Sequence, residues 1–304
     1  MPQQRKAYLY AITAILFWST MGTAFKLSLR TMNAPLLLLF ASGTAFIFLS
    51  ITLLLSGKYK LLGNLSRKSW IRSALMGFCN PFMYYMVLFN AYTLIQAQEA
   101  VALNYIWPVM LVLFSILFLK QRIGWLSISA ILISFCGTFI IATHGQIAGF
   151  RFTNPAGTFL ALGSSVFWAA FFILNMKDQR EEYSKMFLNF FFGLLYIFTW
   201  NLLTGNLHIP ELKSIVGSVY IGIFEMGLTF VIWLTALKLS TTTARVSNLV
   251  YLSPFISLFL VSVFVGEKIL LSTLAGLVII VAGILLQQYS NYRLKPDAQK
   301  DQGL

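Results

Sequence analysis

AVALNYIWPVMLVLFSILFL, residues 100–119, contains no Asp, Glu, Lys or Arg. Its length matches the hydrocarbon core of a bilayer, which an α-helix crosses with about 20 residues. Backbone groups surrounded by lipid must be hydrogen-bonded within their own segment, so this stretch is expected to be a membrane-spanning helix. Asn104 and Pro108 then lie inside the membrane, where polar and helix-breaking residues need a reason.

The same pattern recurs along the chain. Eight further stretches without an acidic or basic residue are long enough to span, and one more is interrupted only by Glu225. None of them shows the alternation that is typical of membrane β-barrels. The sequence therefore predicts an all-α integral membrane protein with ten transmembrane helices, within 7–25, 31–57, 73–98, 100–119, 123–150, 152–176, 186–210, 214–237, 246–266 and 269–292.

Composition supports a membrane protein and argues against nucleic acid as a partner. Of the 304 residues, 58% are hydrophobic and only 10% are charged, whereas soluble domains carry about 25% charged residues. The net charge of +13 comes from Lys and Arg between the apolar stretches, and these residues form no stripe along one face. We expect the partners to be membrane lipid and a small-molecule substrate. The sequence leaves the oligomeric state open.

The distribution of Lys and Arg predicts the orientation in the membrane. With the N-terminus inside, the inner segments carry 17 Lys and Arg and the outer segments carry 5. Positive residues favour the cytoplasmic side. Both termini are therefore expected in the cytoplasm, and the number of spans is expected to be even.

The two halves of the chain resemble each other. Matching residues occur at offsets of 145 to 150: Phe17-Trp18 with Phe167-Trp168, Gly77 with Gly222, Pro108 with Pro254, and Gly137 with Gly283. Five spans are an odd number, so two copies of such a unit must have opposite orientations in the membrane. Inverted repeats are typical of secondary transporters, whose substrate site lies near the midplane. We expect repeats over 7–150 and 152–292, followed by a polar cytoplasmic tail over 293–304.

Pro108 and Pro254 lie in corresponding helices of the two repeats. Each proline lacks a backbone N–H, so the carbonyls of Asn104 and Val250, four residues earlier, lose their helical donor. Such carbonyls are tolerated in a membrane when another helix, a water-filled cavity or a ligand satisfies them. A packing kink is one interpretation. The symmetric placement favours helix breaks that line a central cavity.

Polar and aromatic residues gather around the prolines. Asn104 and Trp107 share a helix face with Pro108. Trp and Tyr also serve as anchors at membrane interfaces, but Trp18, Trp107 and Trp168 lie deeper in their spans. The predicted substrate-binding residues are Trp18, Asn80, Tyr84, Asn104, Tyr105, Trp107, Trp168, Glu225, Asn248 and Tyr251.

Glu225 is the acidic residue closest to the middle of a predicted span. A charge there costs about 2.5 to 3.5 kcal/mol on insertion scales, so such residues are functional candidates. Glu225 could bind a proton or the ammonium group of a substrate, or it could be a neutral acid hydrogen-bonded within the bundle. Anionic substrates are disfavoured because no Lys or Arg lies near the midplane.

We find no chemistry of an enzyme in the sequence. There is no His-Glu-x-x-His metal motif, no P-loop and no Ser/His constellation. We therefore predict no catalytic residue, no metal ligand and no cofactor. A membrane-embedded enzyme is the least favoured reading.

Over residues 7–289 the chain resembles the EamA-type family of the drug/metabolite transporter superfamily. The resemblance rests on the two five-helix halves, the Phe-Trp pairs, the paired prolines and Gly266-Glu267. Lys120-Gln121-Arg122 departs from the family, which often has an acidic residue there. The stretch Asn104-Tyr105-Ile106-Trp107-Pro108 is similar to that of the bacterial aromatic amino acid exporters of the YddG type.

This resemblance implies a multi-pass protein of the bacterial inner membrane. It implies export of aromatic or amphipathic amino acids by alternating access through an aromatic-lined cavity. A multidrug or metabolite exporter of the same fold is the alternative.

Overall fold

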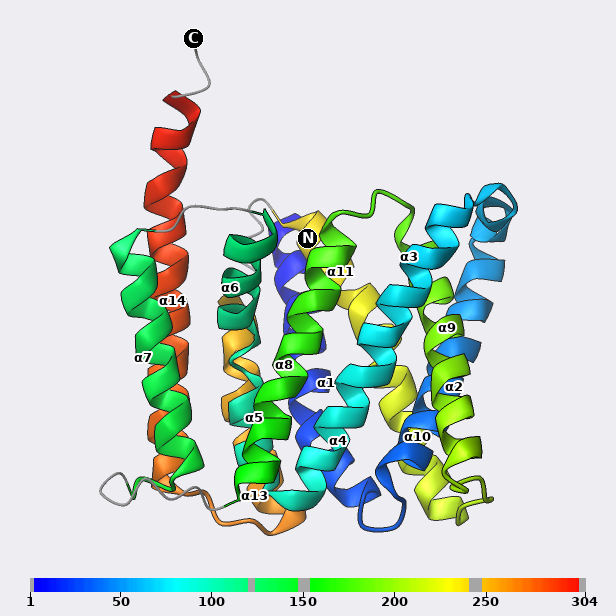
Figure 1. Ribbon diagram of the computed structural model, residues 1–304, viewed down its shortest axis with the longest axis horizontal. Helices are drawn as coiled ribbons and strands as arrows, with labels where there is room; N and C mark the ends of the chain where they lie inside the picture. Colours follow the sequence, from blue (N-terminus) through cyan, green and yellow to red (C-terminus); the bar gives the residue numbers. More distant parts are fainter. Residues whose placement is uncertain (1–2, 120–123, 147–153, 241–247, 301–304) are drawn as a thin grey trace.

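The computed structural model describes residues 3–119, 124–146, 154–240 and 248–300, and every regular element in these ranges is a helix (Figure 1). The first half contains α1 (Gln3–Ser28), α2 (Ala34–Leu55), η1 (Lys58–Asn64), α3 (Arg67–Gly77), η2 (Phe78–Met83), α4 (Tyr84–Leu94), α5 (Ala97–Asn104), α6 (Trp107–Leu119) and α7 (Trp125–Ala142). The second half contains α8 (Pro155–Met176), α9 (Glu182–Leu203), α10 (Leu212–Phe224), α11 (Leu228–Leu239), η4 (Asn248–Leu252), α13 (Ser253–Val265) and α14 (Leu271–Lys300).

The all-helical membrane class predicted from the sequence is confirmed. Within the described ranges, eight helices are long and apolar enough to cross a bilayer: Gln3–Ser28, Ala34–Leu55, Ala97–Phe118, Trp125–Ala142, Pro155–Met176, Glu182–Leu203, Leu212–Leu239 and Leu271–Ser290. A shorter apolar helix covers Leu249–Val265. Eight is two fewer than the predicted ten, because η2 interrupts the segment from α3 to α4 and because the helix ending at Val265 is short.

Two long helices begin with the same local chemistry. The side chain of Asn33 accepts a hydrogen bond from the N–H of Leu36, and the side chain of Asn154 accepts one from the N–H of Gly157. Each cap is followed by a proline in the first turn. Asn side chains satisfy the free N–H groups at a helix start, and a proline has no N–H to leave unsatisfied there. These signals set where α2 and α8 begin.

The helices around the centre are broken. Asn80 has non-helical backbone angles (φ −150°, ψ 120°) inside η2, and Glu225 to Gly227 separate α10 from α11. The predicted break at Pro108 lies slightly earlier, at Tyr105 and Ile106. Pro108 is therefore in the first turn of α6, where its missing N–H carries no cost. Pro254 similarly lies in the first turn of α13.

Helices from both halves pack together in the core. Helix α1 packs against α10, α11 and α13, and α8 packs against α4, α5 and α6. The pair α2 and α9 lies at one edge of the molecule, and the pair α7 and α14 lies at the other edge (Figure 1). The α7–α14 pair packs against α5, and Gln288 of α14 also bonds to Tyr251 in η4.

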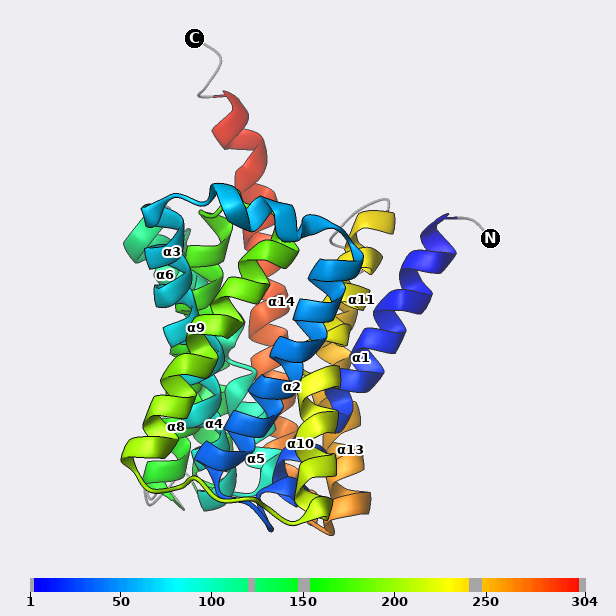
Figure 2. The same ribbon diagram turned by 90° about the vertical axis from the view of Figure 1, so that its right-hand side faces the viewer.

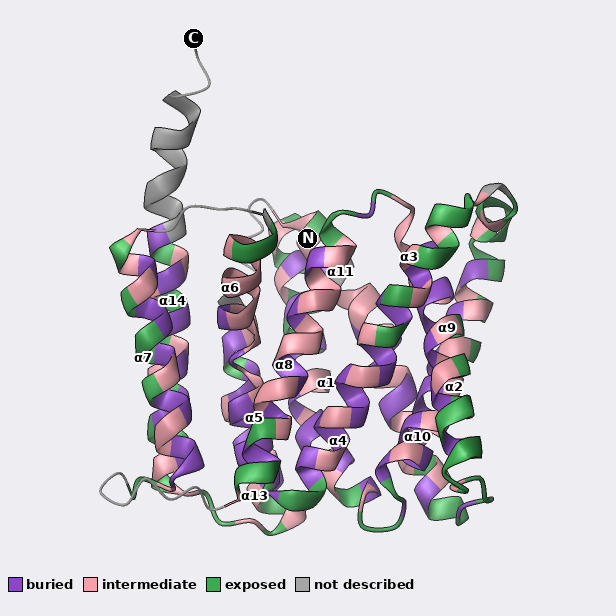
Figure 3. Ribbon diagram, in the orientation of Figure 1, coloured by how far each residue is buried: buried purple, intermediate pink, exposed green. Residues whose placement is uncertain are grey.

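The outer faces of the helices carry the exposed side chains, and the buried faces point inward (Figure 3). Many exposed side chains are large and apolar, for example Leu55, Leu203 and Phe264. A surface of this kind suits contact with lipid chains. The beginning of α1 and the end of α14 lie at the same end of the helix bundle in both views (Figures 1 and 2). This end is called the terminal end below.

Candidate functional site: a central aromatic cavity

A cavity of about 510 Å³ lies among the helices of the two halves. Its walls come from α1, α4, α5, α6, α8, α11, α14 and the segment from η4 to α13, with Glu225 contributed by the break between α10 and α11. Small-molecule sites in proteins have volumes of about 300 to 1,000 Å³. The cavity is therefore large enough for a solute with one or two rings.

The structure brings most of the predicted site residues together. The cavity is lined by Trp18, Tyr84, Asn104, Tyr105, Trp107, Trp168, Glu225 and Tyr251, and by Pro108. Pro254 is buried at the start of α13 and is not part of the wall. That these residues bind substrate stays a prediction.

Two predicted residues are not found in the wall. Asn80 is buried within η2, with only 5% of its surface exposed, and the lining residues do not include it. The side chain of Asn248 lies outside the described part of the structure. The prediction that both residues contact substrate stays open.

The aromatic side chains form the walls through ring contacts between helices. Trp168 of α8 lies 4.8 Å from Tyr84 of α4, measured between ring centroids. Trp107 of α6 stacks on Phe172 of α8 at 5.5 Å, with only 16° between the ring planes. Such offset and tilted arrangements are the favourable ones for aromatic pairs. The rings therefore hold one another in place and leave their remaining faces available to a ligand.

On the α1 side of the cavity, Trp18 contacts two rings of α11. Its ring lies 5.4 Å from Trp233 and 5.8 Å from Phe230. Phe230 also lies 6.1 Å from Trp168, so the rings continue from α1 through α11 to α8. Residues from both halves thus share one aromatic wall.

Hydrogen bonds order the polar side chains of the cavity. The hydroxyl of Tyr84 donates to Oδ1 of Asn104 (3.2 Å), and Nδ2 of Asn104 donates to Oγ of Ser164 (2.8 Å). The hydroxyl of Tyr85 donates to Oε1 of Glu225 (3.0 Å). Buried polar groups that are paired in this way stabilise one arrangement of the site.

The carbonyl of Val250 lacks a helical donor, so another group is expected to satisfy it. In the structure the hydroxyl of Tyr105 donates to that oxygen at 3.3 Å. Tyr105 belongs to the first half and Val250 to the second, so the contact joins the broken helices of the two halves. The hydroxyl of Tyr251 accepts instead from Nε2 of Gln288, at 2.6 Å.

Several residues of the site were not predicted. Tyr85 bonds to Glu225, and Phe172, Phe230, Trp233 and Gln288 line the cavity. Phe172 follows Trp168 by four positions, and helical periodicity places such residues on one face. That signal was available for Phe172. The participation of Gln288 and Phe230 depends on how their helices pack, which periodicity does not reveal.

Polar contacts join several helices at the end opposite the termini. Nζ of Lys26 in α1 donates to the carbonyls of Tyr92 (2.7 Å) and Ile95 (2.8 Å). The carboxylate of Glu267, which follows α13, accepts from the N–H groups of Ala97 (2.9 Å) and Gln98 (3.2 Å). These contacts tie α1, the α4–α5 junction and the α13–α14 connection together.

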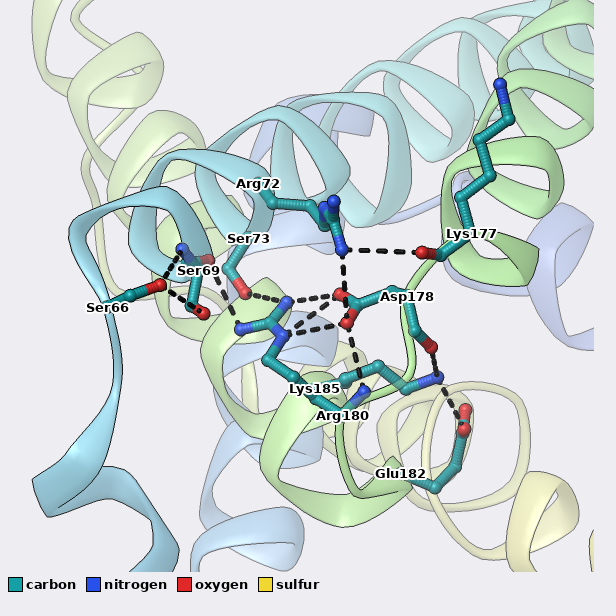
Figure 4. A network of polar contacts seen from close by, with 9 residues as sticks. All are labelled: Ser66, Ser69, Arg72, Ser73, Lys177, Asp178, Arg180, Glu182 and Lys185. Atoms are coloured by element: carbon teal, nitrogen blue, oxygen red, sulfur yellow. Dashed lines mark hydrogen bonds and ion pairs between the residues drawn. The ribbon is translucent and has the colours of Figure 1, made fainter.

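A cluster of ion pairs lies at the terminal end, between α3 and the α8–α9 connection (Figure 4). Nη2 of Arg180 donates to Oδ2 of Asp178 (2.6 Å) and to Oγ of Ser73 (2.9 Å). Nη1 of Arg72 lies 3.6 Å from Oδ1 of Asp178. Burial disfavours the charged form of Asp178, but hydrogen bonds from Arg180 and the charges of both arginines outweigh it and lower the pKa of this carboxyl.

Comparison with known proteins agrees with the fold. The model of the EamA-like transporter family matches twice, over residues 5–143 and 155–287. An uncharacterized transporter of Clostridium kluyveri is 25% identical over 94% of both chains. The aromatic amino acid exporter YddG of Salmonella typhimurium is 24% identical and covers 93% of this chain and 96% of its own.

The fold also matches that of a solved crystal structure. It superposes with a TM-score of 0.63, at 22% sequence identity, and covers 95% of this chain and 98% of its own. Because the family model spans most of the chain in two consecutive matches, this protein is a membrane transporter that belongs to the EamA-like transporter family.

Proposed function

We propose that the protein is a secondary transporter that exports aromatic or other amphipathic amino acids across the bacterial inner membrane. The observation that carries the proposal is the central cavity, whose wall combines rings from both halves with a few ordered polar groups. Relatives at modest identity that are named aromatic amino acid exporters support the direction and the substrate class. Aromatic walls bind a ring by stacking, worth about 0.5 to 1.5 kcal/mol beyond burial for each aromatic pair.

The proposal includes ten membrane crossings. Eight of them are the long apolar helices. The other two are the interrupted segment from α3 through η2 to α4 and the short helix pair of η4 and α13. Both chain ends at the same end of the bundle require an even number of crossings (Figures 1 and 2). The excess of Lys and Arg in the segments on that side, 17 against 5, favours a cytoplasmic terminal end.

Matched close contacts support two inverted repeats, 7–150 and 152–292. In the α7–α14 pair, a β-carbon added at Gly137 would collide with the carbonyl of Gly276, and one added at Gly283 would collide with that of Ala130. Adding 146 to the residue numbers converts Gly137 into Gly283 and Ala130 into Gly276. The same contact is therefore made twice, as a pseudo-twofold axis between the halves requires.

A second pair of contacts follows the same rule. A β-carbon at Gly77 would collide with the carbonyl of Asn189 in α9, and one at Gly222 would collide with the carbonyl of Ala41 in α2. The offsets are 145 for the glycines and 148 for the carbonyl residues. These offsets lie within the range of the matches between the two halves of the sequence.

With inverted repeats around one cavity, transport follows from alternating access. The two repeats exchange conformations and expose the cavity to one side of the membrane at a time. The uncharged polar groups of Asn104 and Tyr251 orient the solute without binding it too tightly for release.

Flux measurements in proteoliposomes test the proposed function. Radiolabelled tryptophan or phenylalanine is expected to cross membranes that contain the protein. Trp168→Ala and Trp107→Ala each remove a ring of the cavity wall and should lower the flux about tenfold or more. Trp125→Ala is the matched control, because Trp125 is 84% exposed on the outside of α7. Absence of flux in the wild type, or equal flux in the three variants, would reject the proposal.

A multidrug exporter of the same fold is the second candidate. The observation that favours it is Glu225, a carboxylate in an aromatic cavity, because carboxylates and aromatic faces both attract organic cations. Competition of the amino acid flux by a lipophilic cation without an amino acid moiety, such as tetraphenylphosphonium, distinguishes this candidate.

A further inference from the structure

The charged side chains in the described wall of the cavity have one sign, which is negative. Of the described residues that line it, one is acidic, Glu225, and none is Lys, Arg or His. Two basic residues at the ends of the helix bundle are engaged by other groups. Lys26 donates to backbone carbonyls at the end opposite the termini, and Arg180 pairs with Asp178 at the terminal end. Within the described part of the wall, a bound solute therefore meets a carboxylate without a compensating protein cation.

Glu225 has acceptor capacity left for a ligand. It is the C-cap residue of α10, at the break before α11, and its side chain lines the cavity. Tyr85, which is only 1% exposed, donates one hydrogen bond to Oε1. An ionised carboxylate has about four acceptor positions on its two oxygens. A primary ammonium group, with three donors, fits the remaining ones.

The aromatic residues of the wall add a second attraction for a cation. Trp18, Trp168 and Trp233 line the same cavity as Glu225. The face of an indole ring carries negative potential and attracts an ammonium group within about 6 Å of the ring centroid. Carboxylate and ring faces together form a site for the positive end of an aromatic amine.

To the negative end of an amino acid, the described wall offers only uncharged donors, and three of these are already engaged. The amide of Asn104 donates to Ser164, and the hydroxyls of Tyr84 and Tyr105 donate to Asn104 and to the carbonyl of Val250. These donors are already used within the protein. A second carboxylate, brought in by the solute, would also be repelled by Glu225.

We propose that the site prefers a primary aromatic amine without a free carboxylate over the corresponding amino acid, with its ammonium group on Glu225. The proposal rests on the proposed function, because it concerns the cargo of the same cavity. It goes further by ranking substrates by charge, and it names Glu225 as the residue that determines this specificity.

A series of indole compounds that differ in charge tests the proposal. Tritiated tryptamine is bound to the detergent-solubilised protein and displaced by unlabelled tryptamine (cation), tryptophan (zwitterion) or indole-3-propionate (anion). We expect tryptamine to compete about tenfold more strongly than tryptophan, and indole-3-propionate to compete least. Equal competition by all three, or a preference for tryptophan, would overturn the proposal.

Glu225→Gln keeps the size of the side chain and its ability to accept from Tyr85. The ratio of tryptamine affinity to tryptophan affinity is expected to fall about tenfold, toward one. Glu211→Gln is the matched control, because Glu211 is exposed just before the start of the same helix α10. If Glu225→Gln does not fold, the series on the wild type decides alone.

The outcomes separate this proposal from the proposed function. Tryptophan flux in proteoliposomes without a preference for tryptamine would leave the export of amino acids standing and reject only the specificity. A preference of about tenfold for tryptamine that persists in Glu225→Gln would also reject it, since the charge would then not be its source. No binding and no flux for any member of the series would reject both.

Discussion

At Gly22, three helices approach one another closely beside the cavity. A β-carbon added there would lie 2.7 Å from Cγ2 of Val101 in α5 and 2.9 Å from Oγ of Ser257 in α13. Both distances are shorter than any ordinary contact of a β-carbon. The absence of a side chain at Gly22 therefore allows α1 to pack against a helix of each half.

Gly22→Ala is expected to destabilise the protein by about 1 to 3 kcal/mol, the usual cost of overpacking. Thermal unfolding in detergent, followed by intrinsic fluorescence, should show a lower melting temperature. Gly43→Ala is the control, because no atom lies within 4 Å of its added β-carbon and alanine favours the helix α2. Equal melting temperatures of both variants would contradict the close packing at Gly22.

At the scale of elements, the broken helices of the two halves share one hydrogen bond that the repeat does not duplicate among the described residues. Tyr105 donates to the carbonyl of Val250, whereas its counterpart under the offset of 146, Tyr251, bonds to Gln288. The corresponding bond, from Tyr251 to the carbonyl of Asn104, is not among the hydrogen bonds of the described residues. Under alternating access, we expect Tyr251 to donate to the carbonyl of Asn104 in the opposite state, in which Tyr105 no longer bonds to Val250.

Tyr105→Phe and Tyr251→Phe are then expected to shift the conformational equilibrium in opposite directions. One hydrogen bond contributes about 0.5 to 1.5 kcal/mol, so each shift should be about two- to tenfold. The reporter is Leu111→Cys in the cavity wall, on a background that lacks Cys79 and Cys136. Its labelling by a membrane-impermeant thiol reagent is compared from the two sides. Shifts in the same direction would contradict the exchange.

The ion-pair cluster of Asp178 joins α3 to the connection between α8 and α9. Asp178→Ala should lower the free energy of unfolding by about 1.5 to 3 kcal/mol, because hydrogen bonds to a buried charge are lost. Lys58→Met removes a pair of similar length, Lys58 with Glu181 (2.7 Å), but both of its members are about one-third exposed. Exposed pairs contribute at most about 1 kcal/mol. Unfolding in detergent should therefore show that Asp178→Ala is less stable than Lys58→Met.

The same cluster predicts a pH dependence. The pKa of Asp178 is lowered in the folded protein. Asp178 therefore contributes to the free energy of unfolding at pH values above its unfolded pKa, which is about 3.9 for Asp. The contribution is lost only as the pH falls through the lower folded pKa. The stability difference between wild type and Asp178→Ala should stay constant from about pH 8 to pH 5 and shrink below about pH 4. A loss near pH 6 would assign the titration to another group.

At the scale of the whole molecule, we expect the charge at the two ends of the bundle to set the orientation in the membrane. Alkaline phosphatase fused after Thr31, between α1 and α2, should be active, because that connection lies at the end opposite the termini. A fusion after Gly63 should be inactive, and green fluorescent protein after Leu304 should fluoresce. The reverse pattern would place the terminal end outside and would overturn the direction inferred from Lys and Arg.

Much of the cavity could be predicted from single positions in the sequence. Trp168 and Glu225 attract notice because indole rings and carboxylates are costly or unusual deep in a span. Pro108 and Pro254 mark broken helices because a proline has no backbone N–H to donate. Asn80 shows the limit of such arguments. It is as polar as Asn104, but the turn of η2 buries it away from the wall. The cost of burying a polar side chain indicates that the residue has a role. It does not indicate whether the side chain faces the cavity.

The sequence by itself determined that the chain is helical and lies in a membrane, because span length and hydropathy are sums over neighbouring residues. The repeated motifs and the distribution of charge are also local properties of the sequence. Only the tertiary structure decided that Tyr105 meets Val250, that Tyr85 meets Glu225 and that Gln288 reaches the cavity. These partners are 37 to 145 residues apart, and their meeting depends on how whole helices pack, which no local sum contains.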